Sequence, residues 1–365
     1  MTDKWVNYNI PGNMKRYYLE VSVDNSKDAS SKAVKDCNQI LKNLGFTSFQ
    51  LNILRSGNKF IKKINNSFQM MKIYKIPKNS LVIIPHPIYI NKKYMEFIKN
   101  AKEKNNLVLV FLIHDLDSLR GMFLDAKKDF EWLDNTMYEI ADYIIAHNAN
   151  MISYLIEKGV SRNKIINLKI FDYLTDLNIQ KKEIKRSLTL NIAGNLDAKK
   201  SGYLEKLNYI DKDIHINLYG VNYSKSLLFS DSFIYKGSFS PEQIPNQLNE
   251  GFGLVWDGYD IDGCKGNTGE YLKYNNPHKL SLYLISGLPV IIWSHAAEAD
   301  FVIKNKIGLA VDNISDIKDV YESLTEENYK EMVINVKKCA EKVSCGYYLN
   351  HAIEELNSKL EQGMK

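Results

Sequence analysis

Two residues that can move a proton follow the most apolar segment of the sequence. His114 and Asp115 come directly after the run Leu107–Ile113, which has the length and composition of a strand buried on both faces. A carboxylate or an imidazole at that place can take a proton from an attacking hydroxyl group. The same spacing also fits a buried histidine followed by a helix N-cap at Asp115 or Asp117. The sequence pattern leaves both interpretations open.

A second segment combines a helix start with basic residues. Asn276 is predicted to be the N-cap and Pro277 the first helical residue, because proline is favoured at that position. A cation in the first turn, such as Lys279, is unfavourable beside the positive end of the helix dipole unless an anion lies between them. The first turn therefore predicts a diphosphate site formed by His278, Lys279 and Ser281. The alternative is a solvated lysine on a capped helix.

Glycine closes the first predicted strand of the second half. Gly194 and Asn195 end this strand and precede a helix, whose free N–H groups can bind an anion. Lys199 and Lys200 can add positive charge at the same place. An ordinary turn with a helix cap is the alternative.

Two further strands end in a similar way. Tyr219 and Gly220 close one of them, and Gly237 and Ser238 follow the other. Glycine at a strand end permits the close approach of a base or a sugar, and Tyr219 can stack on a base. Tight turns beside a core tyrosine explain the pattern equally well.

Two polar segments are considered as ligand contacts. The carboxylates of the triplet Asp260–Asp262, in the loop 258–276, can hold a divalent metal together with a diphosphate. Such triplets are common by chance, so solvation of the loop is favoured and no metal is predicted. The segment 23–33 after the first strand can close over a ligand or form a plain surface loop.

The elements that carry these residues alternate along the chain. Apolar, β-branched runs alternate with amphipathic stretches, which predicts parallel sheets covered by helices on both faces. We expect two doubly wound α/β domains, 1–175 and 187–345, joined by a polar connection at 172–187 and followed by a helix in 346–365. Ligands of such sheets bind beyond the carboxyl ends of the strands, which favours a cleft between the domains. The expected helices include 31–44, 198–208, 242–249, 278–286 and 326–343.

Composition limits the class of protein. The chain has 365 residues, of which 45% are apolar and 25% charged, as expected for a globular protein of two domains. The net charge of +5 suits a phosphate-bearing small molecule and is too small to indicate a nucleic-acid-binding protein. Four cysteines without a CxxC pair argue against a disulfide scaffold or structural zinc. The N-terminus does not resemble a signal peptide and no run is long enough to span a membrane, which predicts a cytoplasmic location.

The motifs together resemble a known family. Their combination and order are similar to bacterial β-1,6-galactofuranosyltransferases of polysaccharide biosynthesis, from about residue 21 to about residue 348. A more distant resemblance is to the glucosyltransferases that extend sugar on serine-rich streptococcal adhesins. The segments that carry the first resemblance are 114–121, 170–174, 193–196, 219–223, 253–258 and 275–279.

The resemblance implies a fold and an activity. The implied fold is GT-B, with two facing Rossmann-like domains and the donor held mainly by the second. The implied activity is the inverting transfer of galactofuranose from UDP-galactofuranose to a glycan or lipid-linked acceptor, without metal or cofactor. Two alternatives are a UDP-glucose-dependent glucosyltransferase acting on a serine-rich adhesin and a non-catalytic nucleotide-sugar-binding partner.

The resemblance also implies site residues. Asp115 is the preferred base and His114 the second choice, while Ser31 and Lys32 approach the diphosphate from the first domain. The residues expected to border the nucleotide are Gly194, Asn195, Lys199, Tyr219, Gly237, Ser238, His278, Lys279, Leu280 and Ser281.

The same family implies partners. Homo-oligomers are implied by the resemblance alone, and a lipid-linked acceptor would bring the protein to the inner face of the membrane. The basic pairs at 62–63, 92–93 and 127–128 can provide contact with anionic lipid. Scattered surface lysines are the alternative explanation of these pairs.

Overall fold

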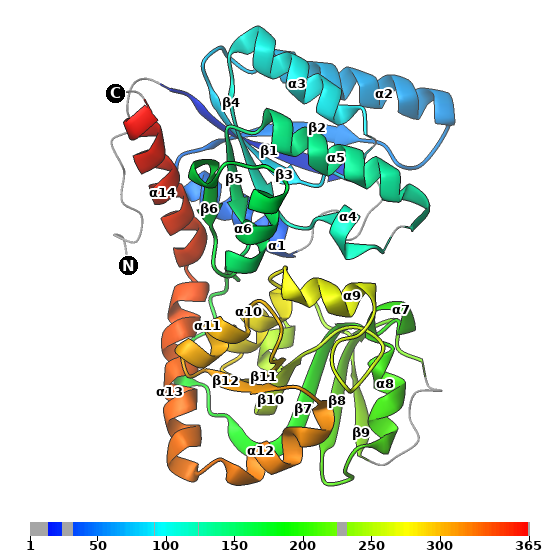
Figure 1. Cartoon of the computed structure of the whole chain (residues 1–365), viewed down its shortest axis with the longest axis vertical. Helices are drawn as coiled ribbons and strands as arrows, with labels where there is room; N and C mark the ends of the chain where they lie inside the picture. Colours follow the sequence, from blue (N-terminus) through cyan, green and yellow to red (C-terminus); the bar gives the residue numbers. More distant parts are fainter. Residues whose placement is uncertain (1–13, 24–31, 91, 123, 225–231, 364–365) are drawn as a thin grey trace. The chain divides into compact units, whose positions relative to one another are not determined.

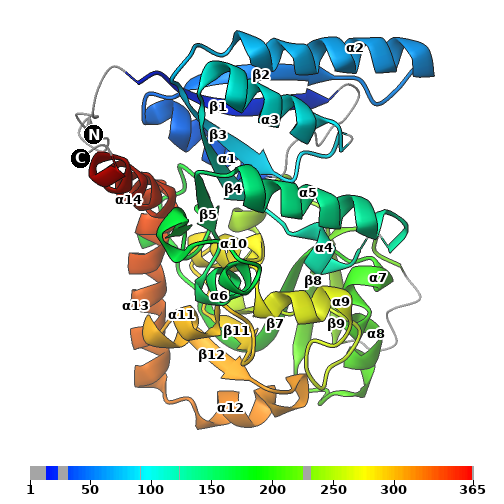
Figure 2. The same cartoon turned by 45° about the horizontal axis from the view of Figure 1, so that its top comes forward.

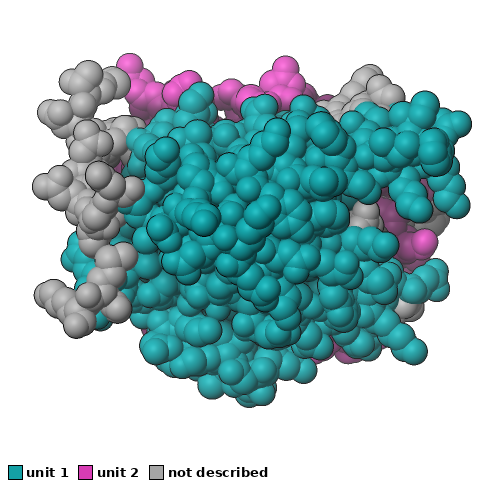
Figure 3. All heavy atoms as spheres, turned by 90° about the horizontal axis from the view of Figure 1, so that it is seen from above, with its two compact units in different colours: residues 1–147, 151–168, 348–365 teal, residues 148–150, 169–347 magenta. Residues whose placement is uncertain are grey.

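The computed structural model describes residues 14–23, 32–90, 92–122, 124–224 and 232–363. The chain divides into two compact units, which Figure 3 distinguishes by colour. Unit 1 comprises Met1–His147, Met151–Leu168 and Tyr348–Lys365, and unit 2 comprises Asn148–Asn150 and Lys169–Tyr347. Each unit is described by itself below.

Unit 1 contains a parallel sheet in the order β2-β1-β3-β4-β5-β6 (Figure 1). Its inner strands β3 and β4 are almost wholly buried, because helices cover both faces of a parallel sheet. The strands are β1 (Arg16–Val23), β2 (Thr47–Ile53), β3 (Leu81–His86), β4 (Val108–Ile113), β5 (Tyr143–Ala146) and β6 (Ile165–Asn167).

The strand order of unit 1 reverses after β2. Since crossovers between parallel strands are right-handed, α1 lies on one face of the sheet and α2, α3 and α5 lie on the other (Figure 2). The helices are α1 (Lys32–Asn43), α2 (Lys59–Met71), α3 (Tyr94–Asn105), α4 (Asp117–Arg120), α5 (Lys127–Ile140), α6 (Ala149–Glu157) and α14 (Tyr347–Gly363).

Unit 2 contains a second parallel sheet, in the order β12-β11-β10-β7-β8-β9. The strands are β7 (Lys185–Asn195), β8 (His215–Val221), β9 (Phe233–Gly237), β10 (Glu250–Val255), β11 (Val290–Trp293) and β12 (Gly308–Val311). The helices are α7 (Ala198–Ser201), α8 (Tyr203–Lys206), α9 (Asn267–Glu270), α10 (His278–Ile285), α11 (Ala299–Lys304), α12 (Ile317–Ser323) and α13 (Glu326–Val343).

The expected α/β class is confirmed by two six-stranded parallel sheets within the described residues. Three local predictions are wrong. The single helix expected at 198–208 is divided into α7, α8 and a 3-10 turn, Leu207–Tyr209. The helix expected at 242–249 is only a 3-10 turn, Ile244–Asn246, because Pro245 cannot donate the backbone hydrogen bond that a longer helix needs. The N-cap of α10 is Pro277 and its first residue is His278, because Asn276 turns its side chain to Lys169 and Asn148 instead.

The segment that follows Lys169 packs on unit 2. The backbone N–H of Tyr173 donates to the carbonyl of Val343, and its hydroxyl donates to the carbonyl of Pro241. The ammonium group of Lys182 donates to the carbonyls of Pro245 and Leu248. The polar stretch expected to connect two domains is thus hydrogen-bonded to one of them.

The last helix, α14, contributes to the core of unit 1. Its buried face includes Leu349, Ile353 and Leu356, and the Asn357 side chain accepts a hydrogen bond from Arg16 of β1 at 3.0 Å. Unit 1 is therefore built from both ends of the described chain. Among the described residues, no helix combines the length and apolar character that a membrane span requires.

Candidate active site

In the sheet of unit 2, the direction in which successive strands are added reverses between β7 and β10. Strands β8 and β9 follow β7 on one side, whereas β11 and β12 follow β10 on the other. Ligands of open α/β sheets bind beyond the carboxyl ends of the strands at such a switch point. Asn195 ends β7 and Asp257 lies two residues beyond β10, so both belong to this edge.

Helix α10 is anchored to the same two strands through Tyr283. The Tyr283 hydroxyl accepts a hydrogen bond from the backbone N–H of Ala193 in β7 at 3.0 Å. A Cβ atom at Gly253 in β10 would lie only 2.1 Å from the Tyr283 ring, so glycine is required for the ring to pack there. This fit fixes where the first turn of α10, which carries Lys279, meets the sheet edge.

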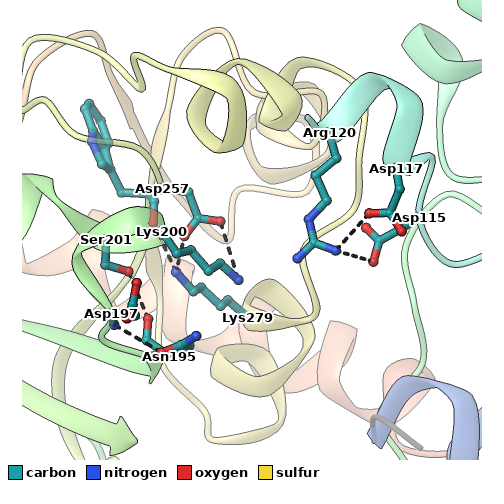
Figure 4. A network of polar contacts seen from close by, with 10 residues as sticks. Asp115, Asp117, Arg120, Asn195, Asp197, Lys200, Ser201, Asp257 and Lys279 are labelled. Atoms are coloured by element: carbon teal, nitrogen blue, oxygen red, sulfur yellow. Dashed lines mark hydrogen bonds and ion pairs between the residues drawn. The ribbon is translucent and has the colours of Figure 1, made fainter. Parts of the chain in front are cut away.

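Lys279 is held in a defined position beside the switch point (Figure 4). Its Nζ donates to Oδ1 of Asp257 at 2.7 Å and to the carbonyl oxygen of Trp256 at 3.0 Å. Both partners are largely buried, as is Lys279 itself. Because an ammonium group has three N–H donors, the two acceptors that the described residues supply leave one donor for a ligand.

The ends of β7 and β8 approach each other closely. Gly194 and Gly220 face each other in the strand register, and a Cβ atom at Gly220 would lie 1.7 Å from the carbonyl oxygen of Gly194. The Cβ position of Gly194 is itself 3.6 Å from Cε of Lys279. Glycine at these two positions therefore keeps the strand ends close together and bare of side chains next to Lys279.

Asn195 organises the loop after β7 (Figure 4). Its side-chain oxygen accepts hydrogen bonds from the backbone N–H of Asp197 and from the Asn222 amide, and its carbonyl accepts one from the Ser201 hydroxyl. Lys200 lies 3.9 Å from the second carboxyl oxygen of Asp257. Lys199 is exposed on α7.

Several residues predicted to border the nucleotide use their side chains within the protein. His278 shares a hydrogen bond with the carbonyl of Asp172 and stacks on Tyr173. The Ser281 hydroxyl donates to the carbonyl of Phe171 at 2.5 Å, and Leu280 is fully buried. In the first turn of α10, Lys279 is thus the side chain directed to the sheet edge.

The predicted base-stacking residue is also largely enclosed. Tyr219 is buried, and burial raises the pKa of its hydroxyl to about 12. Its ring centroid lies 6.3 Å from that of Phe239. Gly237 ends β9 with a positive φ of 102°, and Ser238 beyond it is exposed.

In unit 1, the residues after β4 form an ion-paired cluster (Figure 4). Arg120 lies 2.9 Å from Asp115 and 3.6 Å from Asp117. Asp115 is about one-quarter exposed, whereas Asp117 is buried, and burial raises the pKa of the Asp117 carboxyl group. The backbone N–H of His114 donates to the carbonyl of His86 at 2.8 Å, which ties the end of β4 to that of β3.

A buried hydrogen-bond network holds helix α4, which carries part of this cluster. Nε2 of His86 lies 2.6 Å from Oδ1 of Asp134, and the Ser118 hydroxyl donates to the other carboxyl oxygen of Asp134. Ser118 belongs to α4, which also carries Asp117 and Arg120. The N-cap of α4 is Leu116, so neither aspartate caps this helix.

The remaining residues that were considered as ligand contacts are Ser31, Lys32 and the carboxylates of the loop 258–276. Ser31 lies outside the described residues, and Lys32 starts α1, where it forms an ion pair with Asp36 at 2.5 Å. Asp260 forms ion pairs with Lys206 and Lys265, and the hydrogen bond from Lys206 lowers the pKa of its carboxyl group. Within the described ranges, no group of three or more histidine, cysteine or acidic side chains is arranged to hold a metal.

The comparisons with known proteins agree with this architecture. Residues 16–170 and 190–356 match the family descriptions "Glucosyltransferase 3-like, N-terminal domain" and "Glucosyltransferase 3-like, C-terminal domain". The chain is 38% identical over 257 residues to the β-1,6-galactofuranosyltransferase WbbI of Escherichia coli (strain K12), covering 69% of this chain and 72% of WbbI. It is 25% identical over 282 residues to glucosyltransferase 3 of Streptococcus gordonii, covering 73% and 76% of the two chains.

Solved structures share the fold. Anabaena HepE in complex with UDP aligns with a TM-score of 0.57 at 10% identity, covering 96% of this chain and 100% of HepE. The lipopolysaccharide outer core galactosyltransferase WaaB aligns with a TM-score of 0.59 at 14% identity, covering 93% and 99%. The fold and the relatives define a glycosyltransferase of the GT-B class. Within that class, the chain belongs to the glucosyltransferase 3-like family, and the predicted resemblance is confirmed.

Sequence reasoning did not select Asp257, Arg120 or the pair His86 and Asp134. Asp257 lies two residues beyond β10, so a search for polar residues near the ends of strands could have found it. Arg120 is the last residue of α4 and Asp134 lies in the middle of α5, and charged residues are common at both places in a helix. Only their three-dimensional partners distinguish them from surface residues.

Proposed function

We propose that the protein transfers galactofuranose from UDP-galactofuranose to a hydroxyl group of a glycan or a lipid-linked sugar. The observation that carries the choice of donor is the 38% identity to a relative named as a β-1,6-galactofuranosyltransferase. The binding of a uridine nucleotide is supported by the fold shared with HepE, which was solved with UDP and with UDP-glucose.

Unit 2 is proposed to hold the donor diphosphate at the switch point. The third N–H of Lys279 and the first backbone N–H groups of α10 are donors for its oxygens. Pro277 provides no side-chain cap to this helix, so a ligand does not compete with a cap. Gly194 and Gly220 leave the neighbouring backbone open to the nucleotide.

The proposed reaction is a single displacement. An acceptor oxygen attacks the anomeric carbon, the bond from that carbon to the diphosphate oxygen breaks, and UDP leaves. Direct attack on an α-linked donor inverts the configuration and gives a β-linked product. Negative charge that develops on the leaving oxygen is stabilised by Lys279, a preorganised and largely buried cation.

Unit 1 is proposed to supply the base. The Asp115 carboxylate takes the proton of the acceptor hydroxyl as the new bond forms, while Arg120 orients the carboxylate through its contact with Oδ2. His114 is the second choice, because it follows the same strand. The buried Asp117 is less suited, since burial raises its pKa and favours the neutral form.

A donor and acceptor screen tests this proposal. The purified protein is incubated with UDP-galactofuranose, UDP-galactopyranose or UDP-glucose and with pyranoside acceptors, and products are analysed by mass and by linkage. A β-linked furanoside formed from UDP-galactofuranose alone supports the proposal. Faster transfer from UDP-glucose overturns the donor assignment.

A second candidate function is the same single displacement with a different donor and acceptor. The family descriptions and the streptococcal relatives are named as glucosyltransferases, which favours UDP-glucose as the alternative donor. The acceptor would then be a sugar already attached to a serine-rich adhesin. The same screen, extended to a glycosylated serine-rich peptide, distinguishes the two.

A further inference from the structure

Helix α2 exposes an apolar face on the outside of unit 1. One side of the helix is packed, through Gln69 and Met70, next to β2 at the edge of the sheet (Figures 1 and 2). The opposite side carries large apolar side chains. They are Phe60, Ile61, Ile64, Phe68 and Met71, each between 55% and 70% exposed.

The spacing of these residues makes a single stripe. Residues 60, 64, 68 and 71 recur every three to four positions, so their side chains lie on one face of a helix. The stripe extends for about 17 Å, given a rise of 1.5 Å per residue from Phe60 to Met71. Single exposed apolar residues are ordinary, but a contiguous exposed patch marks an interaction surface.

Along the sequence, the segment that contains α2 carries charge of one sign. From residue 37 to residue 95 the sequence has ten lysines and arginines and no aspartate or glutamate. The whole chain carries a net charge of +5, so the remaining residues carry a net −5. Four lysines of α2 and the segment after it are exposed: Lys59, Lys63, Lys75 and Lys78.

We propose that α2 is a membrane-docking helix that binds the surface of a bilayer containing anionic lipid. An amphipathic helix with a cationic border lies in the plane of the interface, where its apolar side chains enter the acyl boundary. The lysines gain from the negative potential of anionic headgroups. The inference goes beyond the proposed transfer reaction and does not depend on the donor.

Charge also argues against a second copy of the chain as the occupant. In a two-fold dimer the same patch of both subunits meets, which would bring two strongly cationic surfaces together. Like charges at close range are repulsive, whereas phosphate headgroups neutralise them. The surface therefore fits an anionic bilayer better than its own copy.

Vesicle co-sedimentation of the full chain tests the proposal. Vesicles of phosphatidylcholine alone are compared with vesicles that also contain phosphatidylglycerol, at low and high salt. We expect sedimentation with the anionic vesicles only, weakened by salt. The double variant Lys59→Gln/Lys63→Gln should partition about 30-fold less, since each lysine near the surface contributes about fivefold.

The apolar stripe is tested separately. Phe60→Ser/Phe68→Ser should lower partitioning by at least about tenfold, because two exposed aromatic side chains no longer enter the bilayer. Ile334→Ser/Lys330→Gln on α13 is the matched control, with an exposed isoleucine and an exposed lysine elsewhere, and should sediment like the wild type. All of these changes are at exposed positions, so folding is preserved.

Three results would overturn the proposal. They are equal sedimentation with neutral and anionic vesicles, no sedimentation with either, and unchanged sedimentation of the stripe variant. Light scattering after size exclusion provides a further test. If the wild type is an oligomer that Phe60→Ser/Phe68→Ser converts to a monomer, a second copy covers the stripe and the membrane is not its partner.

Discussion

Nζ of Lys279 lies 2.7 Å from Oδ1 of Asp257, and both side chains are largely buried. An ion pair with so little exposure holds the lysine in one geometry before any ligand arrives. The proposed leaving-group stabilisation depends on this positioning, because preorganised charge costs no reorganisation during the reaction.

Lys279→Ala is expected to lower turnover by roughly 10²–10³-fold, the effect of removing one preorganised charge-stabilising donor. The measurement is the steady-state rate of UDP release with saturating donor and acceptor. Lys304→Ala, which removes an exposed lysine from α11, serves as the control and should retain full activity. Wild-type turnover in the Lys279 variant would remove this residue from the reaction.

Asp257→Asn is expected to strengthen UDP binding and to lower turnover. Removing a carboxylate near the proposed diphosphate relieves repulsion, so UDP should bind several times more tightly by calorimetry. The ammonium group loses its orienting partner, so kcat should fall by about 10–100-fold. A variant with unchanged kcat and unchanged UDP affinity would show that the pair is structural only.

Asp115→Asn is expected to abolish transfer and leave UDP affinity near that of the wild type, because the amide cannot accept the acceptor proton. Asp117→Asn is the matched comparison. Asp117 is buried, whereas Asp115 is about one-quarter exposed, so the Asp117 variant should keep most of its activity. The reverse order of activities would transfer the role of base to Asp117.

Gly220→Ala is expected to destabilise unit 2 by about 2–6 kcal/mol. About 1–3 kcal/mol comes from the positive φ of 145°, and a similar amount comes from the overlap of a Cβ atom with the Gly194 carbonyl. Gly237 also has a positive φ, but a Cβ atom there would contact only Phe239, at 3.9 Å. Gly237→Ala should therefore lower the free energy of unfolding by only about 1–3 kcal/mol. Urea unfolding monitored by fluorescence measures the free energy of unfolding of both variants. Equal losses of stability would exclude a contribution from the overlap with the Gly194 carbonyl.

Glu298→Gln is expected to change how stability depends on pH. Burial raises the pKa of the Glu298 carboxyl group well above its ordinary value of 4.5, and neither carboxyl oxygen has a hydrogen-bond partner among the described residues. Above pH 4.5 the unfolded chain releases this proton while the native protein keeps it. The wild type should therefore lose up to about 1.4 kcal/mol per pH unit relative to the variant until the native group also ionises.

The control for this experiment is Asp300→Asn, which removes an exposed carboxylate two residues along the chain. Chemical denaturation at several pH values between 4.5 and 8 gives the free energy of unfolding of all three proteins. Parallel pH curves for the wild type and Glu298→Gln would contradict an environment that holds the carboxyl group neutral.

Much of the fold could be predicted because its strands are apolar runs bounded by polar turns. The helix predicted at 326–343 agrees with α13 residue for residue. The pair β2 and α2 was not predicted. Most side chains of β2 are exposed or half-buried, and α2 exposes its apolar face, so neither shows the pattern of a core element.

The candidate site was predictable only in part. Lys279 could be singled out because a cation in the first turn of a helix requires a reason. The pairing of Lys279 with Asp257 could not be predicted, because no local pattern indicates that β10 lies beside β7. Leu280 and Ser281 are buried because α10 lies within the core of unit 2, which the sequence of the helix start does not reveal.

The position of α14 has a consequence for how the protein matures during synthesis. Unit 1 needs this helix to cover Arg16 and the neighbouring strand, yet the ribosome delivers it after all of unit 2. The first unit to emerge is thus the last that can be completed, and its unfinished surface is exposed to chaperones and proteases while the second unit is being translated.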